Sequence, residues 1–280
     1  MLKPFNLKCP VKFFTNAELN YQVNGPGTLI LNVHALRTPH QSVVSETLSV
    51  EPYHKAEEIF SISGENRLIR LKLTKTGPLT IRYQAVVDNT YVAKDPAGLL
   101  ETQVDQLSPE ILPMLYPSRY CQSDKLGRLA GHLFGHDGSA YEKVRAIVDW
   151  IYANVEYRSG FSNVETSAYD TVTQQAGVCR DFAHLAIALC RALSIPARYF
   201  TAYAYLLEPQ DFHACFEAYL GGEWVLFDAT KLAPINGLIK IASGRDAADA
   251  SIANIFGDIS FCSLQVSCDL GDVEFVPLYQ

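Results

Sequence analysis

The sequence lacks several features that would assign it to a particular class. No run of apolar residues approaches the roughly 18 that a membrane helix needs, and the first residues show neither the apolar segment nor the cleavage site of a signal peptide. Lys and Arg total 23 against 30 Asp and Glu, and this net charge of −7 argues against nucleic acid as a partner. We therefore expect a cytoplasmic protein that binds neither nucleic acid nor a membrane.

Paired cysteines are missing as well. The seven cysteines are an odd number and form no Cys-x-x-Cys motif, which argues against both a disulfide framework and a zinc knuckle and suits a reducing compartment. The residues indicate no cofactor and no metal. Hydrophobic residues make up 48% of the 280 residues and charged residues 19%, a composition typical of a globular protein.

The first 110 residues have the pattern of an all-β domain. Alternating or β-branched runs occur at 28–34, 67–73 and 79–87, separated by turn-forming residues. We expect a β-sandwich of about seven strands. The three histidines of this half share no ligand spacing and are expected at the surface: His34, His40 and His54.

The second half changes character after a connection with three prolines at 108–120. Ser139 and Glu142 form a capping box ahead of apolar residues at helical spacing, which predicts a helix over 140–154. A second helix is predicted to begin near Cys179 and to end at Ile195-Pro196. We therefore divide the chain into an N-terminal β-sandwich domain (1–110) and an α+β domain (111–280).

Three strands are expected after this helix: 198–206, 213–220 and 223–228. Gly221-Gly222 is a two-residue link typical of a tight hairpin, so Leu220 pairs with Glu223 and the next pairs follow. Because side chains alternate along strands, His213 and Asp228 then share one face as diagonal neighbours. A three-residue turn would move Asp228 to the opposite face.

The chemistry concentrates at the start of the second helix, in Gly177-Val-Cys-Arg-Asp181. Unpaired N–H groups and the helix dipole favour an anion there, which favours a thiolate and could stabilise the oxyanion formed when it attacks a carbonyl. An imidazole that accepts the thiol proton and a carboxylate that orients it complete such a site. We predict these roles for Cys179, His213 and Asp228.

Three alternatives stand beside this interpretation. In the first alternative, Cys179 is a small buried hydrophobic residue at a helix start. In the second, His213 and Asp228 form an ordinary surface pair. A metal site built from Cys179, His184 and His213 has little support, since three ligands on separate elements lack a paired motif. Arg180, Asp181 and His184 are interpreted as structural.

The chain resembles the transglutaminase-like superfamily, specifically its bacterial cysteine-protease branch. The matching blocks occur in order over roughly 140–260: Val148–Tyr157, Ala176–Leu185, Ala188–Arg198, Asp211–Tyr219, Glu223–Thr230 and Gly244–Asp249. The resemblance implies a papain-like core in which a helix-borne cysteine packs on an antiparallel sheet carrying histidine and aspartate, and it places these on Cys179, His213 and Asp228. The first half resembles the β-domain that often precedes this core. This chain has Cys215 where the family often has tryptophan, which suggests a second thiol near the site.

These observations predict a thiol-dependent acyl-transfer enzyme, a cysteine peptidase or amidase that hydrolyses peptide or isopeptide bonds of a peptide or protein substrate through a thioester. The sequence has no Asp-x-Asp-x-Asp calcium loop, so we favour hydrolysis over transamidation of protein glutamine. A catalytically weak peptide-binding scaffold is the alternative from a different class. Salt bridges that fix the C-terminal segment are expected from three residues: Arg245, Asp246 and Asp249.

Overall fold

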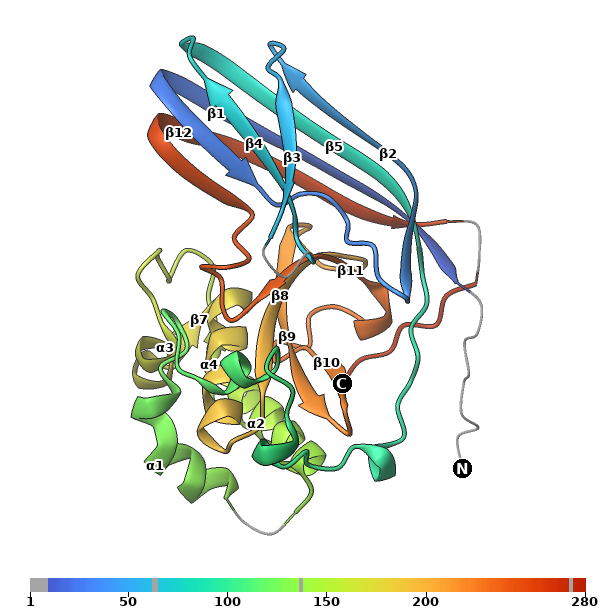
Figure 1. Ribbon diagram of the computed structural model, residues 1–280, viewed down its shortest axis with the longest axis vertical. Coiled ribbons are helices and arrows are strands. Elements are labelled where there is room, and N and C mark those ends of the chain that lie inside the picture. The colour runs from blue at the N-terminus through green and yellow to red at the C-terminus, as the bar shows by residue number, and fades with distance from the viewer. Residues whose placement is uncertain (1–9, 62–64, 136–137, 272–273) are drawn as a thin grey trace.

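The computed structural model describes residues 10–61, 65–135, 138–271 and 274–280. A six-stranded antiparallel sheet is formed by β1 (Val11–Leu31), β2 (Gln41–Glu51), β3 (Ala56–Phe60), β4 (Arg67–Leu73), β5 (Gly77–Asn89) and β12 (Ala253–Leu270). The second half contains α1 (Ser123–Phe134), α2 (Ala140–Asn154), α3 (Ala168–Gln174), α4 (Cys179–Ala192), β8 (Ala197–Ala204), β9 (Phe212–Leu220), β10 (Glu223–Phe227) and β11 (Leu238–Gly244). Figure 1 shows the curled sheet above the helices.

The sheet curls because its longest strand changes partners along its length. β1 pairs with β5 over Val11–Val23 and with β4 over Gly27–Leu31, while β12 follows its other edge. The expected β-sandwich is thus one continuous curled sheet. Among the described residues up to 110 it has five strands, not about seven, because the segment 24–27 bends β1 without ending it.

One expectation for this half is wrong. His34 is not at the surface but 5% exposed, and its ring packs edge-on against Tyr83 with 4.9 Å between centroids. Beside it Arg67 bonds Glu46 at 2.7 Å and Glu58 at 2.8 Å. Burial and the Arg67 charge lower the pKa of His34, so this histidine is buried in its neutral form.

The strand β12 comes from the second half of the chain but completes the first sheet. It pairs antiparallel with β1 from Phe13↔Leu270 to Leu31↔Ala253, with two irregularities in register. The division into domains 1–110 and 111–280 therefore stays a prediction. Residues 253–270 of the second half contribute a strand to the N-terminal sheet. Among the described residues no helix combines the length and apolarity needed to cross a membrane.

The helix α4 is the centre of the second half. Its residues from Asp181 to Arg191 are all buried, as expected for a helix that is apolar on nearly every side. It packs on the four-stranded sheet, whose order is β10-β9-β8-β11, and contacts α1, α2 and α3 (Figure 1). Within this sheet the buried Glu217 bonds Arg198 at 2.8 Å and also Lys240.

The predicted local elements of the second half are confirmed. α2 spans Ala140–Asn154, and its capping box joins the Glu142 N–H to Ser139 Oγ at 3.2 Å and the Ser139 N–H to the Glu142 carboxylate at 2.8 Å. The hairpin register is also the predicted one, running from Glu223↔Leu220 to Phe227↔Phe216. The start of α2 and the pairing of β9 with β10 therefore agree with the sequence prediction.

Candidate active site

Cys179 is the first residue of α4 and is partly exposed. Immediately before it, β7 (Ala176–Gly177) runs parallel to β6 (Glu156–Tyr157). A Cβ at Gly177 would lie 2.8 Å from the Cβ of Asp181, so only glycine lets this strand approach the first helical turn. Asp181 accepts the Val178 N–H at 2.9 Å, which caps the helix just before the cysteine.

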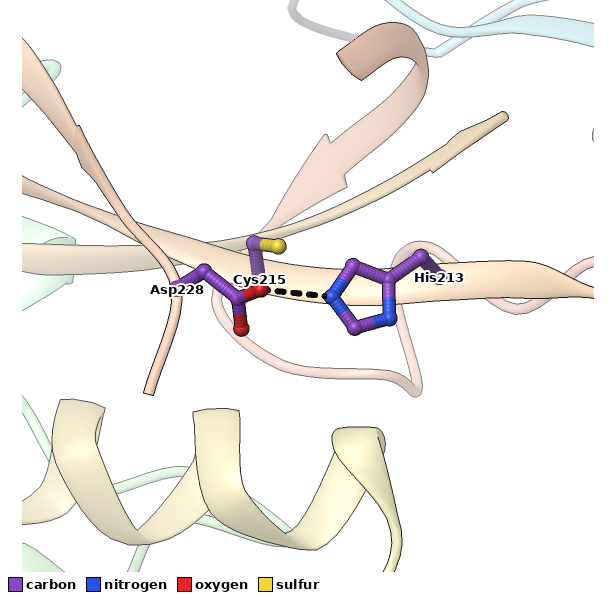
Figure 2. Close-up of side chains that lie close together, drawn as sticks. All are labelled: His213, Cys215 and Asp228. Carbon is purple, nitrogen blue, oxygen red and sulfur yellow. Dashed lines mark hydrogen bonds and ion pairs between the residues drawn. The ribbon is translucent and has the colours of Figure 1, made fainter. Parts of the chain in front are cut away.

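His213 and Asp228 meet at the far end of the hairpin. Phe227↔Phe216 is the last hydrogen-bonded pair, and Asp228 follows it directly. His213 Nε2 lies 3.0 Å from Asp228 Oδ2, and each residue is 1% exposed (Figure 2). The structure therefore brings the predicted imidazole and carboxylate into contact in a buried setting and not as a surface pair.

Asp228 is held by several donors that favour its charged form. Thr230 donates from its N–H at 2.9 Å and from its hydroxyl at 2.7 Å. Burial alone would raise the pKa of Asp228, but the charge of His213 and the hydrogen bonds from His213 and Thr230 outweigh it and lower that pKa. From the other side, the Gln280 side chain accepts the Asp228 N–H at 3.2 Å. The carboxylate is thus ionised and fixed.

The His213 ring responds to this carboxylate. Burial lowers the pKa of His213. This pKa is raised by the charges of Cys215 and Asp228 and by hydrogen bonds with Asp228 and Cys179, and the net shift is well upward. Burial raises the pKa of Cys215 to about 12, so this thiol is neutral near pH 7 and the Asp228 charge is the one that stabilises the imidazolium.

The second ring nitrogen of His213 faces away from Asp228 (Figure 2). Among the described residues this buried Nδ1 has no hydrogen-bond partner of normal geometry, yet the Cys179 side chain acts on the imidazole through a hydrogen bond that raises the pKa of His213. A long or bent contact reconciles the two, and such contacts are common between catalytic groups before substrate binds. The Cys179 side chain is therefore close enough to the His213 ring to act on it.

Cys215 lies beside the His–Asp pair (Figure 2), because the pairing of Leu220 with Glu223, continued along the two strands, places it opposite Asp228. Ligand atoms of His213, Cys215 and Asp228 lie within 4.8 Å of one another, and this nitrogen, sulfur and oxygen set could hold a soft divalent cation such as zinc. The alternative metal set with His184 is wrong, because His184 Nε2 accepts the Ala247 N–H at 3.1 Å and its ring lies between Tyr120 and Tyr199.

The other residues singled out have structural contacts. Arg180 pairs with Asp181 at 3.2 Å, and Arg245 with Asp249 at 2.8 Å as expected. Asp246 differs from expectation: within the described part of the chain it accepts the Tyr120 and Ala248 N–H groups at 2.9 Å each, with no ion pair.

Sequence reasoning missed two neighbours of the site. Thr230 lies two residues after Asp228 and donates two hydrogen bonds to its carboxylate. An aspartate side chain often accepts from the backbone N–H two residues further on, so the Asp-x-Thr spacing could have indicated this contact. Tyr157 interacts with both Cys179 and His213, and nothing in the local sequence indicates that contact because β6 and β7 are 19 residues apart.

A helix-borne thiol beside an imidazole that bonds a buried carboxylate defines the class of thiol-dependent acyl-transfer folds. The comparisons with known proteins agree with this class. Residues 128–229 match the transglutaminase-like superfamily, and residues 11–110 match the bacterial transglutaminase N-terminal domain. A crystal structure of a candidate cysteine protease from Cytophaga hutchinsonii is 55% identical, covers 97% of this chain and 94% of that chain, and superposes with a TM-score of 0.94.

The chain therefore belongs to the transglutaminase-like superfamily, and its fold and relatives support a thiol-dependent enzyme of that superfamily. Two curated relatives extend the likeness. An uncharacterized Mycobacterium leprae protein is 24% identical over 62% of this chain, and an uncharacterized Mycobacterium tuberculosis protein is 39% identical over 40% of it. The matches span 66% and 33% of those two proteins.

Proposed function

We propose that this chain is a cysteine peptidase or amidase that hydrolyses peptide or isopeptide bonds, with Cys179 as nucleophile, His213 as general acid and base, and Asp228 as the orienting carboxylate. The observation that carries the proposal is that the two ring nitrogens of His213 have different surroundings. Nε2 bonds Asp228 at 3.0 Å, Nδ1 has no conventional hydrogen-bond partner among the described residues, and the Cys179 side chain is close enough to the ring to raise the pKa of His213. One ring position is thus fixed and the other is free to exchange a proton.

The reaction begins with proton transfer from the Cys179 thiol to His213 Nδ1. The thiolate attacks the carbonyl carbon, and the carbonyl oxygen becomes an oxyanion close to the start of α4. When the C–N bond breaks, His213 gives its proton to the departing amine and a thioester remains on Cys179. The ionised Asp228 stabilises the imidazolium through both steps.

Hydrolysis completes the cycle. His213 accepts a proton from water as the water oxygen attacks the thioester, and the proton then goes to the sulfur as the acid leaves. A primary amine in place of water would form a new amide bond, which is the transamidase alternative. The name of the Cytophaga hutchinsonii relative, a candidate cysteine protease, favours the hydrolytic route.

A peptide-library experiment tests the proposal. Wild type, Cys179→Ala and the matched control Cys262→Ala are incubated with a library of peptides and branched isopeptides, with and without a primary amine, and products are identified by mass spectrometry. Cys262 is exposed on β12, so its loss should leave activity unchanged. Cleavage by wild type and Cys262→Ala but not by Cys179→Ala is the expected result.

Other outcomes would redirect or end the proposal. Amine incorporation exceeding hydrolysis would assign the transamidase route to the same thioester. Cleavage that survives in Cys179→Ala would reject Cys179 as the nucleophile. If wild type gives no product from either class of substrate, the peptide-binding scaffold becomes the better interpretation.

A further inference from the structure

Tyr157 stands next to the proposed nucleophile although it precedes it by 22 residues. It ends β6 and pairs in parallel with Gly177 of β7, and the Arg158 N–H bonds the Gly177 carbonyl at 2.8 Å. Its ring packs on Phe182 in the first turn of α4, with 5.8 Å between centroids. The backbone bridge and the ring contact together hold the side chain against the helix start.

The hydroxyl of Tyr157 reaches the backbone of Cys179. Burial raises the pKa of Tyr157, and the charges of Cys179 and Asp211 raise it further. The charge of His213 and a hydrogen bond from the Cys179 backbone lower it, and the net pKa is about 12. The phenol therefore keeps its proton at physiological pH. Tyr157 as a whole is nevertheless 42% exposed, so a substrate can reach it.

An oxyanion beside Cys179 needs donors, and the helix start provides one. The N–H groups of a helix's first turn have no acceptor within the helix, and the Cys179 N–H is among them. Two other polar neighbours are unsuitable as a second donor. Arg180 is engaged by Asp181 and the Asn163 carbonyl, and Asp211 is a carboxylate that would repel an oxyanion. Tyr157 is neutral, partly exposed and adjacent.

We propose that the Tyr157 hydroxyl is the second donor of the oxyanion hole, beside the Cys179 N–H. The assignment rests on the proposed function. In the free protein the hydroxyl oxygen lies near the backbone of Cys179. As the tetrahedral intermediate forms, its oxyanion accepts from the Cys179 N–H, and the hydroxyl group turns its hydrogen to the same oxygen. No proton is transferred in this step, and the phenol stays protonated throughout.

Tyr157→Phe tests this assignment by removing one oxygen atom. The ring that packs on Phe182 stays, so the fold and the rate of Cys179 alkylation by iodoacetamide at pH 6 should not change. We expect kcat/KM for peptide cleavage to fall about 100-fold, mainly through kcat, since loss of one oxyanion donor has an effect of this order. The affinity for a peptide aldehyde, which forms a thiohemiacetal on Cys179, should fall in parallel.

Tyr169→Phe is the matched control, because Tyr169 is 44% exposed on α3 and its ring faces Lys125. It should leave kcat/KM and aldehyde affinity unchanged. Equal activity of Tyr157→Phe and wild type would overturn the assignment while leaving the proposed function intact, and higher activity would show that the hydroxyl blocks the site. A wild type that neither cleaves peptides nor captures the aldehyde would end both proposals.

Discussion

Replacing Asp228 by asparagine removes one negative charge from the buried pair and preserves the shape of the side chain. In wild type, the charge favours protonated His213, and protonated His213 in turn favours the Cys179 thiolate. The variant should therefore contain much less of the thiolate–imidazolium pair at pH 6, and Cys179 should react more slowly with an alkylating agent. The pKa of His213 should also move down from its raised value.

The size of the effect follows from the geometry. The two charges are separated by 3.0 Å, and Coulomb's law with an effective dielectric constant of about 20 gives roughly 5 kcal/mol. Removing one partner from a buried pair costs about 3–5 kcal/mol in proteins. Even the lower value corresponds to a factor of about 100 in the population of the ion pair. We expect alkylation of Cys179 at pH 6 to slow by this factor.

The assay is the pH dependence of iodoacetamide alkylation, followed on the peptide that contains Cys179 by mass spectrometry. Asp149→Asn is the matched control, since Asp149 bonds Lys231 on the surface with 53% of its side chain exposed. That control should keep the wild-type profile. If Asp228→Asn also reacts at the wild-type rate at pH 6, the carboxylate does not support the thiolate and the reasoning is refuted.

Three further predictions concern other residues. Cys215→Ala should keep kcat/KM within about twofold of wild type, because burial raises the pKa of this thiol to about 12 and leaves it neutral; a large loss would place it in the chemistry. Gly177→Ala should lower the free energy of unfolding by about 1–3 kcal/mol through the 2.8 Å approach of its Cβ, measured by urea denaturation. Gly127→Ala on an open face of α1 should instead raise it by about 0.5–1 kcal/mol, and equal effects would contradict the packing argument. Glu217→Gln should destabilise by about 3 kcal/mol at pH 7. Two cationic partners lower the pKa of Glu217 in the folded protein below 4.5. The ionised Glu217 therefore stabilises the fold above pH 4.5, and this stabilisation is lost as the pH falls through the pKa of Glu217 in the folded state. The free energies of unfolding of wild type and Glu217→Gln, measured by urea denaturation, should therefore converge in acid.

Local signals were sufficient for the elements that carry the proposed catalytic residues. The capping box of Ser139 and Glu142 marks the start of α2, and Gly221-Gly222 sets the pairing of β9 with β10. Both depend on residues close together in the chain, where periodicity and turn chemistry apply directly. The contact of His213 with Asp228 follows from that register alone.

Long-range placement could not be predicted in the same way. The pairing of β12 with β1 joins residues between 222 and 257 positions apart, and the alternating pattern of a strand does not identify its partner. Tyr157 reaches Cys179 through a bridge between two short strands, which is too little sequence to carry a period. His34 is buried because distant strands supply Tyr83 and Arg67 around it.

The central claim is that Cys179 differs chemically from every other cysteine that the structure describes. Brief treatment of the wild-type protein with iodoacetamide at pH 6, followed by peptide mapping, tests it most directly. Burial raises the pKa of four of the others, Cys121, Cys190, Cys215 and Cys268, which should remain unmodified, and the exposed Cys262 serves as the internal reference. We expect Cys179 to be modified much faster than Cys262. Equal rates at these two positions would contradict the account.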